Sequence, residues 1–133
     1  EIAQCLVGSE MCIRDRSFPD VSEKMNASYL NHGVVITKYT GARGKGGTSD
    51  ASAEYMGKIR ALLDENDVVW QTGELGKVDA GGGGTVAMYL ANLDIDVVDL
   101  GVPVLSMHAP FEVVSKLDVY MAYRAFKVFA EGK

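Results

Sequence analysis

The sequence lacks the features that mark membrane, secreted and nucleic-acid-binding proteins. None of its apolar runs approaches the roughly 20 residues that a helix needs to span a bilayer. Its start has no basic region followed by the small-residue cleavage site of a signal peptide. The formal net charge is −5, whereas binding to nucleic acid needs a basic face. We therefore expect a cytoplasmic protein that binds neither a membrane nor a nucleic acid.

Cysteine is scarce, and its placement is uneven. The only two cysteines, Cys5 and Cys12, lie in the opening EIAQCLVGSEMCIRDR, which has no helical or strand period and resembles a translated sequencing adapter. We therefore predict that residues 1–16 are a non-native leader that packs poorly, and that residues 17–133 form the domain. Without the leader no thiolate remains, so histidine and carboxylate are the strong metal ligands available.

The rest of the pattern alternates between strands and helices. With 133 residues, of which 47% are hydrophobic, the chain can form one domain with a modest core. Short β-branched or apolar runs predict strands at residues 33–39, 67–73, 95–101 and 102–108. Apolar residues at helical spacing predict helices that begin after Ser49 or Asp50, near Thr85 and near Phe111. We expect an α/β domain in which helices cover both faces of a mostly parallel sheet.

Only two histidines occur, and one of them, His108, stands where the last apolar strand gives way to a helix. At this position a neutral imidazole can project into a crevice, ligate a metal or accept a proton. Glu112 follows shortly after it and can orient the ring through its second nitrogen. No second histidine accompanies His108 at metal-binding spacing, so a structural role is the commoner interpretation of a lone histidine.

A run of four glycines, in DAGGGGT at residues 79–85, precedes a predicted helix. Glycines let a backbone approach a ligand closely, and the start of a helix offers free N–H groups to a carbonyl or an anion. Gly82, Gly84 and Ala87 match a G-x-G-x-x-A pattern, but about ten residues separate them from the strand that a dinucleotide-binding fingerprint follows directly. A phosphate- or nucleotide-binding loop at residues 81–85 and a flexible connection both remain open.

A second glycine-rich stretch, GARGKGGTS at residues 41–49, contains two cations but lacks the residue order of a phosphate-binding P-loop. We expect a solvated loop there. Lys38, shortly before it, stands at the end of a strand among apolar neighbours. It can present an ammonium group to a substrate carboxylate or carbonyl, although an exposed lysine at a strand edge is commoner.

Three segments, taken together, resemble one known family. NHGVVITKYTGARGKGGTSDASAEY, WQTGELGKVDAGGGGT and VDLGVPVLSMHAPFE occur in the order and spacing of the C-terminal part of M18-family zinc aminopeptidases, the bacterial relatives of aspartyl aminopeptidase. The resemblance covers residues 17–133. Its most specific part is a Gly-x-Pro-x-x-x-Met-His segment that ends at His108, the position of the histidine that binds one zinc in the family.

The resemblance implies a fold, a chemistry and an assembly. The family has a three-layer α/β/α catalytic domain, and its members form homo-dodecamers. They remove N-terminal residues from peptides with a water that two zinc ions activate, and cobalt or manganese can replace the zinc. By resemblance, His108 is a metal ligand, and the substrate-binding residues are Lys38, Gly83, Gly84, Thr85 and Met107.

The family's other metal ligands and its general base come from upstream motifs that this sequence does not contain. We therefore interpret the chain as a C-terminal fragment without catalytic residues of its own, and we expect it to be inactive alone. Two alternatives remain. One is a small α/β module that binds a phosphate or nucleotide with the loop 81–85, and the other is a structural domain without a ligand.

Overall fold

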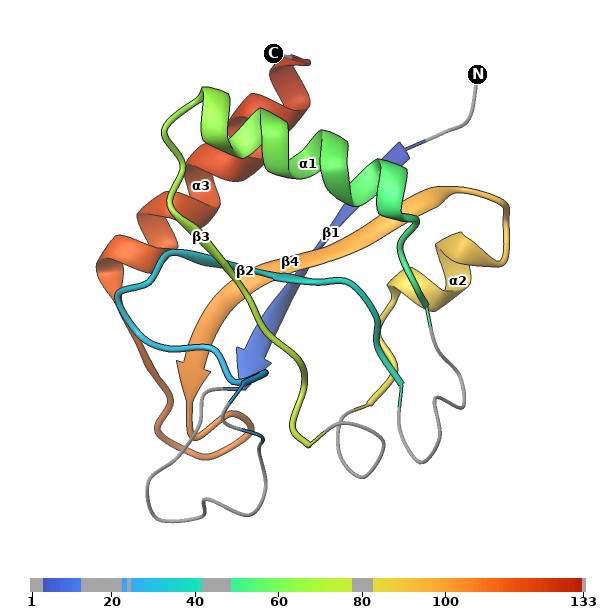
Figure 1. Cartoon of the computed structure of the whole chain (residues 1–133). Coiled ribbons are helices and arrows are strands. Elements are labelled where there is room, and N and C mark those ends of the chain that lie inside the picture. The colour runs from blue at the N-terminus through green and yellow to red at the C-terminus, as the bar shows by residue number, and fades with distance from the viewer. Residues whose placement is uncertain (1–3, 13–22, 24, 42–48, 78–82, 133) are drawn as a thin grey trace.

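The computed structural model describes residues 4–12, 23, 25–41, 49–77 and 83–132. Strands and helices alternate along most of the chain (Figure 1). The elements are, in order, β1 (Gln4–Cys12), β2 (Val34–Thr37), α1 (Ala53–Glu65), β3 (Trp70–Thr72), α2 (Ala87–Ala91), β4 (Asp96–Leu105), β5 (Val113–Val114) and α3 (Lys116–Glu131). None of these helices is long and apolar enough to cross a membrane.

The described strands form one mixed sheet in the order β1-β4-β2-β3, with β5 paired to the end of β4. β1 lies parallel to β4, and β2 lies parallel to β3. β2 and β5 run antiparallel to β4, so the strand direction reverses between β4 and β2. The α/β class is therefore confirmed, and parallel pairing is confined to two pairs of the described strands.

The hydrophobic core lies between one face of the sheet and the two longer helices, α1 and α3 (Figure 1). Side chains alternate between the two faces along a strand, so Val34 and Ile36 of β2 share this face with Val98 and Leu100 of β4. Each of these four side chains is at most 2% exposed. The helices add buried residues at helical spacing: Tyr55, Ile59 and Leu63 from α1, and Ala122, Ala125 and Val128 from α3.

Both ends of α1 have partners for their free backbone groups. Ser52, rather than the predicted Ser49 or Asp50, caps the start of α1, because its side chain accepts a hydrogen bond from a backbone N–H of the first turn at 3.2 Å. Beyond the other end, the Arg124 guanidinium on α3 donates to the backbone oxygen of Asn66 at 2.5 Å. This contact joins α1 to α3.

Two predicted strands are in fact one. The sequence predicts separate strands at residues 95–101 and 102–108, but β4 runs without interruption from Asp96 to Leu105. β1 pairs with β4 in a continuous register, and this ladder keeps the backbone extended through Gly101 and Pro103. Pairing with a distant segment therefore overrides the local turn signals of glycine and proline.

The C-terminal helix begins later than predicted, at Lys116 rather than near Phe111. Val113 and Val114 form β5 instead and pair with the end of β4. Ser115 then caps α3, because its hydroxyl accepts a backbone N–H of the first turn at 3.2 Å. The cap and the short strand together move the helix start toward the C-terminus.

The N-terminal segment differs from the prediction. The expectation that residues 1–16 pack poorly is wrong for β1, which pairs with β4 along all nine of its residues. Leu6 is partly buried and packs against the hydrophobic core. The edge of a long strand such as β4 offers a row of unpaired backbone groups, and an extended segment can satisfy them. Residues 1–3 and 13–16 lie outside the described residues, and the non-native origin of the leader stays a prediction.

Candidate functional site

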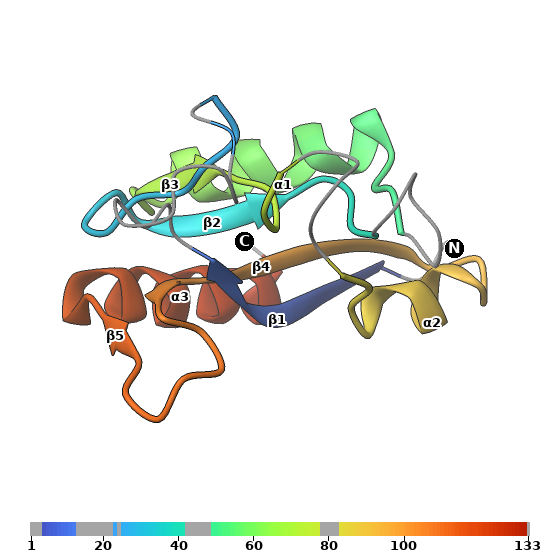
Figure 2. The ribbon, with the colours of Figure 1, turned by 90° about the horizontal axis from the view of Figure 1, so that it is seen from below.

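The segments that carry the predicted site residues lie below the sheet in Figure 1, on the side away from α1 and α3. Residues 83–85 are here called the glycine segment. This segment and Lys38 lie toward the start of β4. Residues 106–112, here called the histidine turn, follow the end of β4. Figure 2 shows α2 and the histidine turn at opposite ends of this strand. From Asp99 to Leu105 the strand extends about 20 Å, at about 3.3 Å per residue. The predicted residues thus form two groups, one toward each end of β4.

Thr85 anchors the glycine segment to β4. Its hydroxyl donates a hydrogen bond to Oδ2 of Asp99 at 2.9 Å. Asp99 alternates with Val98 and Leu100 along β4, so its side chain points away from the core, yet it is only 1% exposed. Its Oδ1 atom has no hydrogen-bond partner among the described residues. Burial raises the pKa of this carboxyl group, and the hydrogen bond from Thr85 opposes that rise.

A second contact connects the glycine segment with the loop after Lys38. The Gly41 N–H donates to the backbone oxygen of Gly83 at 3.0 Å. A Cβ atom at Gly83 would have no described atom within 4 Å, so packing does not require glycine there, and the space beside its backbone is open. Gly84 is exposed, whereas Gly81 and Gly82 lie outside the described residues.

This arrangement disfavours an anion at the glycine segment. The helix that follows, α2, has only five residues, and the favourable field at a helix start comes from aligned peptide dipoles. The Asp99 carboxyl group accepts the Thr85 hydroxyl directly beneath the segment. A phosphate bound there would lie near the Asp99 carboxyl group, which is electrostatically unfavourable when that group is ionised.

Lys38 lies just past the end of β2 and forms an ion pair with Asp50. The two residues face each other because Tyr39 and Asp50 form an antiparallel bridge and Ala51 N–H donates to the Lys38 oxygen at 2.7 Å. The side chains of the pair are 44% and 61% exposed, so water screens the interaction. Solvent, and therefore a ligand, can reach the Lys38 ammonium group.

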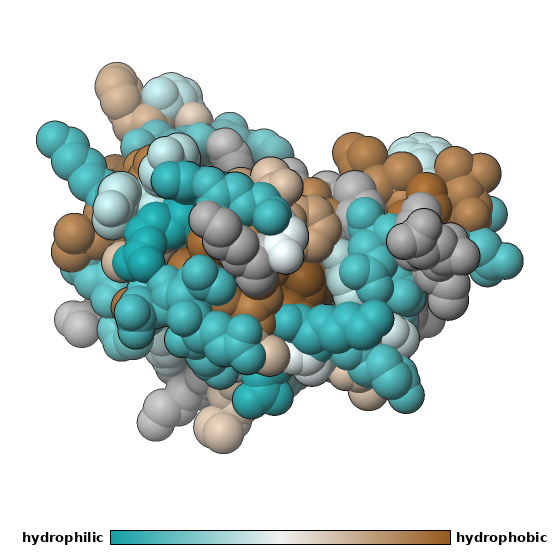
Figure 3. All heavy atoms as spheres, turned by 90° about the horizontal axis from the view of Figure 1, so that it is seen from above, coloured by the Kyte–Doolittle hydropathy of each residue, from teal (hydrophilic) through white to brown (hydrophobic). Residues whose placement is uncertain are grey.

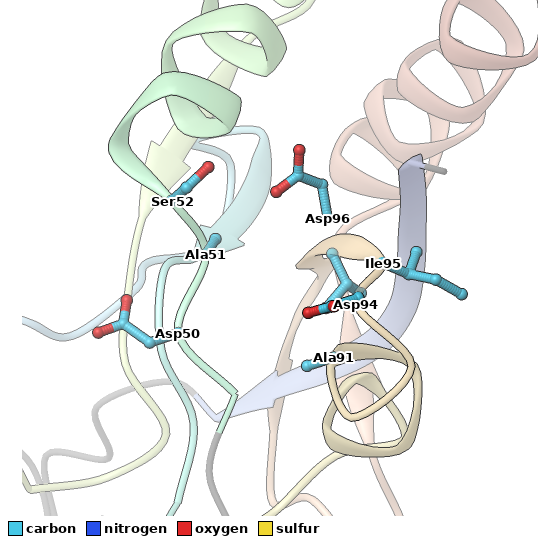
Figure 4. Close-up of a pocket in the computed structure, with 8 residues that line it drawn as sticks. Asp50, Ala51, Ser52, Ala91, Asp94, Ile95 and Asp96 are labelled. Atoms are coloured by element: carbon cyan, nitrogen blue, oxygen red, sulfur yellow. The ribbon is translucent and has the colours of Figure 1, made fainter. Parts of the chain in front are cut away.

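Asp50 also borders a cavity between the start of α1 and the start of β4. The cavity has a volume of about 500 Å³, and the described residues that line it are 50–52, Ala91 and 94–97. Figure 4 shows Asp50 on one side of it, and Asp94 and Asp96 on the other. The walls are therefore acidic, and none of the predicted site residues is among the lining residues described.

The histidine turn holds His108 in an exposed position after β4. His108 and Ser106 have left-handed backbone conformations, with φ of 67° and 59°, which cost energy for residues other than glycine. The His108 N–H donates to Oε1 of Glu112 at 2.5 Å. Glu112 thus stabilises the backbone of the turn, and the predicted contact with the imidazole ring is not formed. Met107, beside His108, is half-buried.

The described residues do not assemble a metal site by themselves. Among them, no three histidine, cysteine, aspartate or glutamate side chains are placed to hold one ion. A catalytic zinc site needs about three protein ligands. His108 can therefore contribute one ligand to a site that residues outside this part of the chain would complete.

Two aspartates that contact predicted site residues were not identified from sequence. Asp99 bonds Thr85, and Asp50 pairs with Lys38. Asp99 does leave a signal, because an aspartate inside the apolar run VVDLG is seldom fully buried without a partner. Asp50 leaves none, since an aspartate before a helix is equally well explained as a cap.

Comparison with known proteins identifies the family. Residues 6–130 match the family described as aminopeptidase I zinc metalloprotease (M18). The chain is 46% identical over 135 residues to a probable M18 family aminopeptidase 1 of Clostridium acetobutylicum, and 47% identical over 114 residues to that of Thermotoga maritima. These alignments cover 97% and 86% of this chain, which spans only 29% and 25% of the two relatives' lengths.

Solved structures agree with this assignment. The crystal structure of aminopeptidase I from Clostridium acetobutylicum matches with a TM-score of 0.90 at 46% identity, over 95% of this chain and 28% of that one. The M18-family aminopeptidase from Thermotoga maritima matches with a TM-score of 0.88 at 44% identity, over 92% of this chain and 27% of that one. The mixed sheet and its helices are therefore shared with these aminopeptidases, and the chain belongs to the M18 family of zinc metalloproteases.

Proposed function

We propose that this chain is part of a two-zinc aminopeptidase that removes N-terminal residues from peptides, and that His108 is one of the zinc ligands. The observation that carries the proposal is the histidine turn. Glu112 holds this turn through the backbone of His108, and the exposed imidazole ring forms no hydrogen bond with a described residue. The ring is thus presented at the end of β4 without being needed for folding.

Zinc ions in such a site would lower the pKa of a bound water and polarise the scissile carbonyl group. We propose two ions per site, with cobalt or manganese as substitutes. The described residues supply one donor, so the remaining ligands and the general base would come from outside them.

We further propose that the substrate pocket is lined by Lys38, Gly83, Gly84, Thr85 and Met107. Three observations support this assignment. The glycine segment lies on the side of the sheet away from α1 and α3, as does the histidine turn (Figure 1). The space beside the Gly83 backbone is open among the described residues. The exposed ammonium group of Lys38 suits a carboxylate or carbonyl group of a substrate.

The first test uses the purified chain alone. With added zinc, cobalt or manganese we expect no measurable release of N-terminal amino acids from peptides, because two ions activate the water and the described residues supply one proposed ligand. A full-length enzyme that contains these residues is the positive control. Metal-dependent hydrolysis that rises in proportion to the concentration of the chain would contradict the prediction.

The second test compares two histidines in the full-length enzyme. His108→Ala should lower kcat/KM by at least about 100-fold, because loss of a group that only orients a metal ligand already costs up to about 100-fold. It should also remove up to one zinc ion per subunit. His32→Ala is the matched control. His32 is also exposed in a turn, where its Nδ1 atom lies 2.8 Å from the Leu30 oxygen, and its loss should leave both readouts unchanged. Full activity and full zinc content in His108→Ala would refute the ligand assignment.

We also propose a homo-oligomer, a dodecamer, for the full-length protein. Exposed apolar side chains support an additional contact surface, since Val86, Tyr89 and Leu93 are 63%, 66% and 70% exposed. Figure 3 shows apolar surface gathered at this α2 end of the molecule. Such a patch is commonly covered by another protein surface. A monomeric mass from light scattering on active full-length enzyme would contradict the proposal.

A further inference from the structure

Asp99 is a buried carboxyl group that packing alone does not explain. It lies in the middle of β4, is 1% exposed, and faces the side of the sheet that carries the glycine segment. Its Oδ2 atom accepts the Thr85 hydroxyl at 2.9 Å, while Oδ1 is buried without a partner among the described residues. A buried acceptor without a donor costs free energy, and an apolar residue of similar size would avoid that cost.

The surroundings of Asp99 show what the carboxyl group holds. Thr37 of β2 stands opposite Asp99 in the antiparallel register, but its hydroxyl donates to the Gly73 oxygen at 2.9 Å. Among the described residues, the Asp99 carboxyl group therefore accepts the Thr85 hydroxyl and not that of Thr37. Two residues before Thr85, the Gly83 oxygen accepts a backbone N–H from the loop after β2. These two hydrogen bonds hold the glycine segment to the rest of the described structure.

We propose that Asp99 is a positioning residue of the substrate pocket, which acts through Thr85 to fix the glycine segment below the sheet. This inference rests on the proposed function, because the pocket role of the glycine segment comes from there. Glycines have no side chains that could be held by packing, and they lose more conformational freedom on folding than other residues. A short glycine segment therefore needs an anchor at its end, and the Asp99–Thr85 hydrogen bond is that anchor.

The test uses the full-length enzyme with matched substitutions. Thr85→Val removes the donor at nearly constant shape, Thr85→Ser keeps a hydroxyl, and Asp99→Ala removes the acceptor. The double variant Thr85→Val with Asp99→Ala shows whether the two side chains act as one unit. Thr37→Val is the control, since it removes a buried hydroxyl with the same donor–acceptor distance of 2.9 Å from the facing position on β2.

Two measurements are made on each variant. Hydrogen–deuterium exchange of the backbone amides at residues 83–88 should rise about tenfold in Thr85→Val, as expected for the loss of one net hydrogen bond. KM for a peptide should rise about fivefold while kcat stays within about twofold, the pattern of weakened uniform binding. Asp99→Ala and the double variant should show the same changes, and Thr85→Ser should restore wild-type values. Thr37→Val should lower thermal stability without changing either measurement.

Each outcome decides one part of the inference. Unchanged exchange at residues 83–88 in both Thr85→Val and Asp99→Ala overturns the positioning role, whatever the activity. If exchange changes in the Thr85 and Asp99 variants but KM does not, the connection to the pocket is overturned. An equal rise of KM in Thr37→Val also overturns it, because loss of any buried hydroxyl would then weaken substrate binding. A wild-type enzyme without aminopeptidase activity refutes the proposed function instead, and the exchange data alone then decide whether Asp99 holds the segment.

Discussion

Two buried aspartates, Asp99 in β4 and Asp118 in α3, have very different surroundings, although each is 1% exposed. Oδ1 of Asp118 accepts the Gly33 N–H at 2.9 Å, and Oδ2 accepts the Asn31 N–H at 2.8 Å. Asp99 receives one hydrogen bond, from Thr85, and its other oxygen has no partner among the described residues. Described residues therefore bond both oxygens of Asp118 but only one of Asp99.

The difference indicates that the Asp118 carboxyl group stabilises the fold, whereas the Asp99 carboxyl group contributes little to packing. Asp118 lies in the first turn of α3, where the helix dipole also favours a negative charge. It fixes a turn in which Asn31 and Gly33 have φ of 63° and 88°. A Cβ atom at Gly33 would lie 2.1 Å from the Val69 oxygen, so the turn has one acceptable geometry. Asp99 instead holds a segment of the candidate site.

Removal of the fully bonded aspartate should have the largest effect on stability. Asp118→Ala leaves two backbone N–H groups without their acceptors, and we expect the free energy of unfolding to fall by about 3 kcal/mol. Urea unfolding measures this change. Ser115→Ala removes the cap of the same helix and the hydrogen bond that the Ser115 hydroxyl donates to Asn31 Oδ1 at 2.6 Å. It is the matched control, with an expected loss of about 1 kcal/mol. A loss in Asp118→Ala no greater than in this control would contradict the comparison.

Substitution of the incompletely bonded aspartate should have a smaller effect that depends on pH. Burial raises the pKa of Asp99 above its usual value of 3.8, so the folded state favours the neutral carboxyl group. The stability that this preference contributes is complete below pH 3.8 and is lost as the pH rises through the raised pKa. Asp99→Asn cannot ionise, so at neutral pH it should be more stable than the wild type, and this advantage should disappear as the pH falls toward 3.8.

Paired urea titrations of the wild type and Asp99→Asn check this prediction from acid to neutral pH. The other carboxyl groups titrate in both proteins, so their contributions cancel in the difference. The two proteins are compared by their free energies of unfolding. If the difference stays constant with pH, or comes to favour the wild type as the pH rises, the Asp99 pKa is not raised.

An exposed aspartate should matter least. Asp50 forms an ion pair with Lys38, but both side chains are largely exposed, so solvent screening and side-chain entropy offset most of the attraction. We expect Asp50→Asn to change the free energy of unfolding by less than about 0.5 kcal/mol. Thermal unfolding at low and high salt measures it. If Asp50→Asn lowers the free energy of unfolding by more than Ser115→Ala does, Asp50 stabilises the fold as Asp118 does, and the prediction is wrong.

The elements that local periodicity predicted are those whose side chains face the core. β2 and α1 follow the strand and helix periods closely, and Ile36, Tyr55 and Leu63 are buried where those periods place them. The continuous β4 and the late start of α3 were not predictable in this way. Their bounds depend on pairing with β1 and β5, which local signals do not report.

In the candidate site, too, some residues could be found from the sequence, whereas their contacts could not. His108 and Thr85 could be selected from sequence because each belongs to a motif with a chemical rationale. The contact of Thr85 with Asp99 joins residues 14 positions apart, and no spacing rule connects them. The placement of Glu112 against the His108 backbone, rather than its ring, likewise depends on the left-handed geometry of the turn.

By itself, the sequence determined the alternation of strands and helices, which depends on residue types at fixed spacings, and the family resemblance, which makes His108 a candidate ligand. The tertiary structure alone decided that β1 joins the sheet, that β4 is one strand and that Asp99 is buried with one oxygen that no described residue bonds. Each of these features depends on groups that are distant in the sequence. A ladder of backbone hydrogen bonds along a whole strand outweighs local β propensities, which span only about 1 kcal/mol per residue.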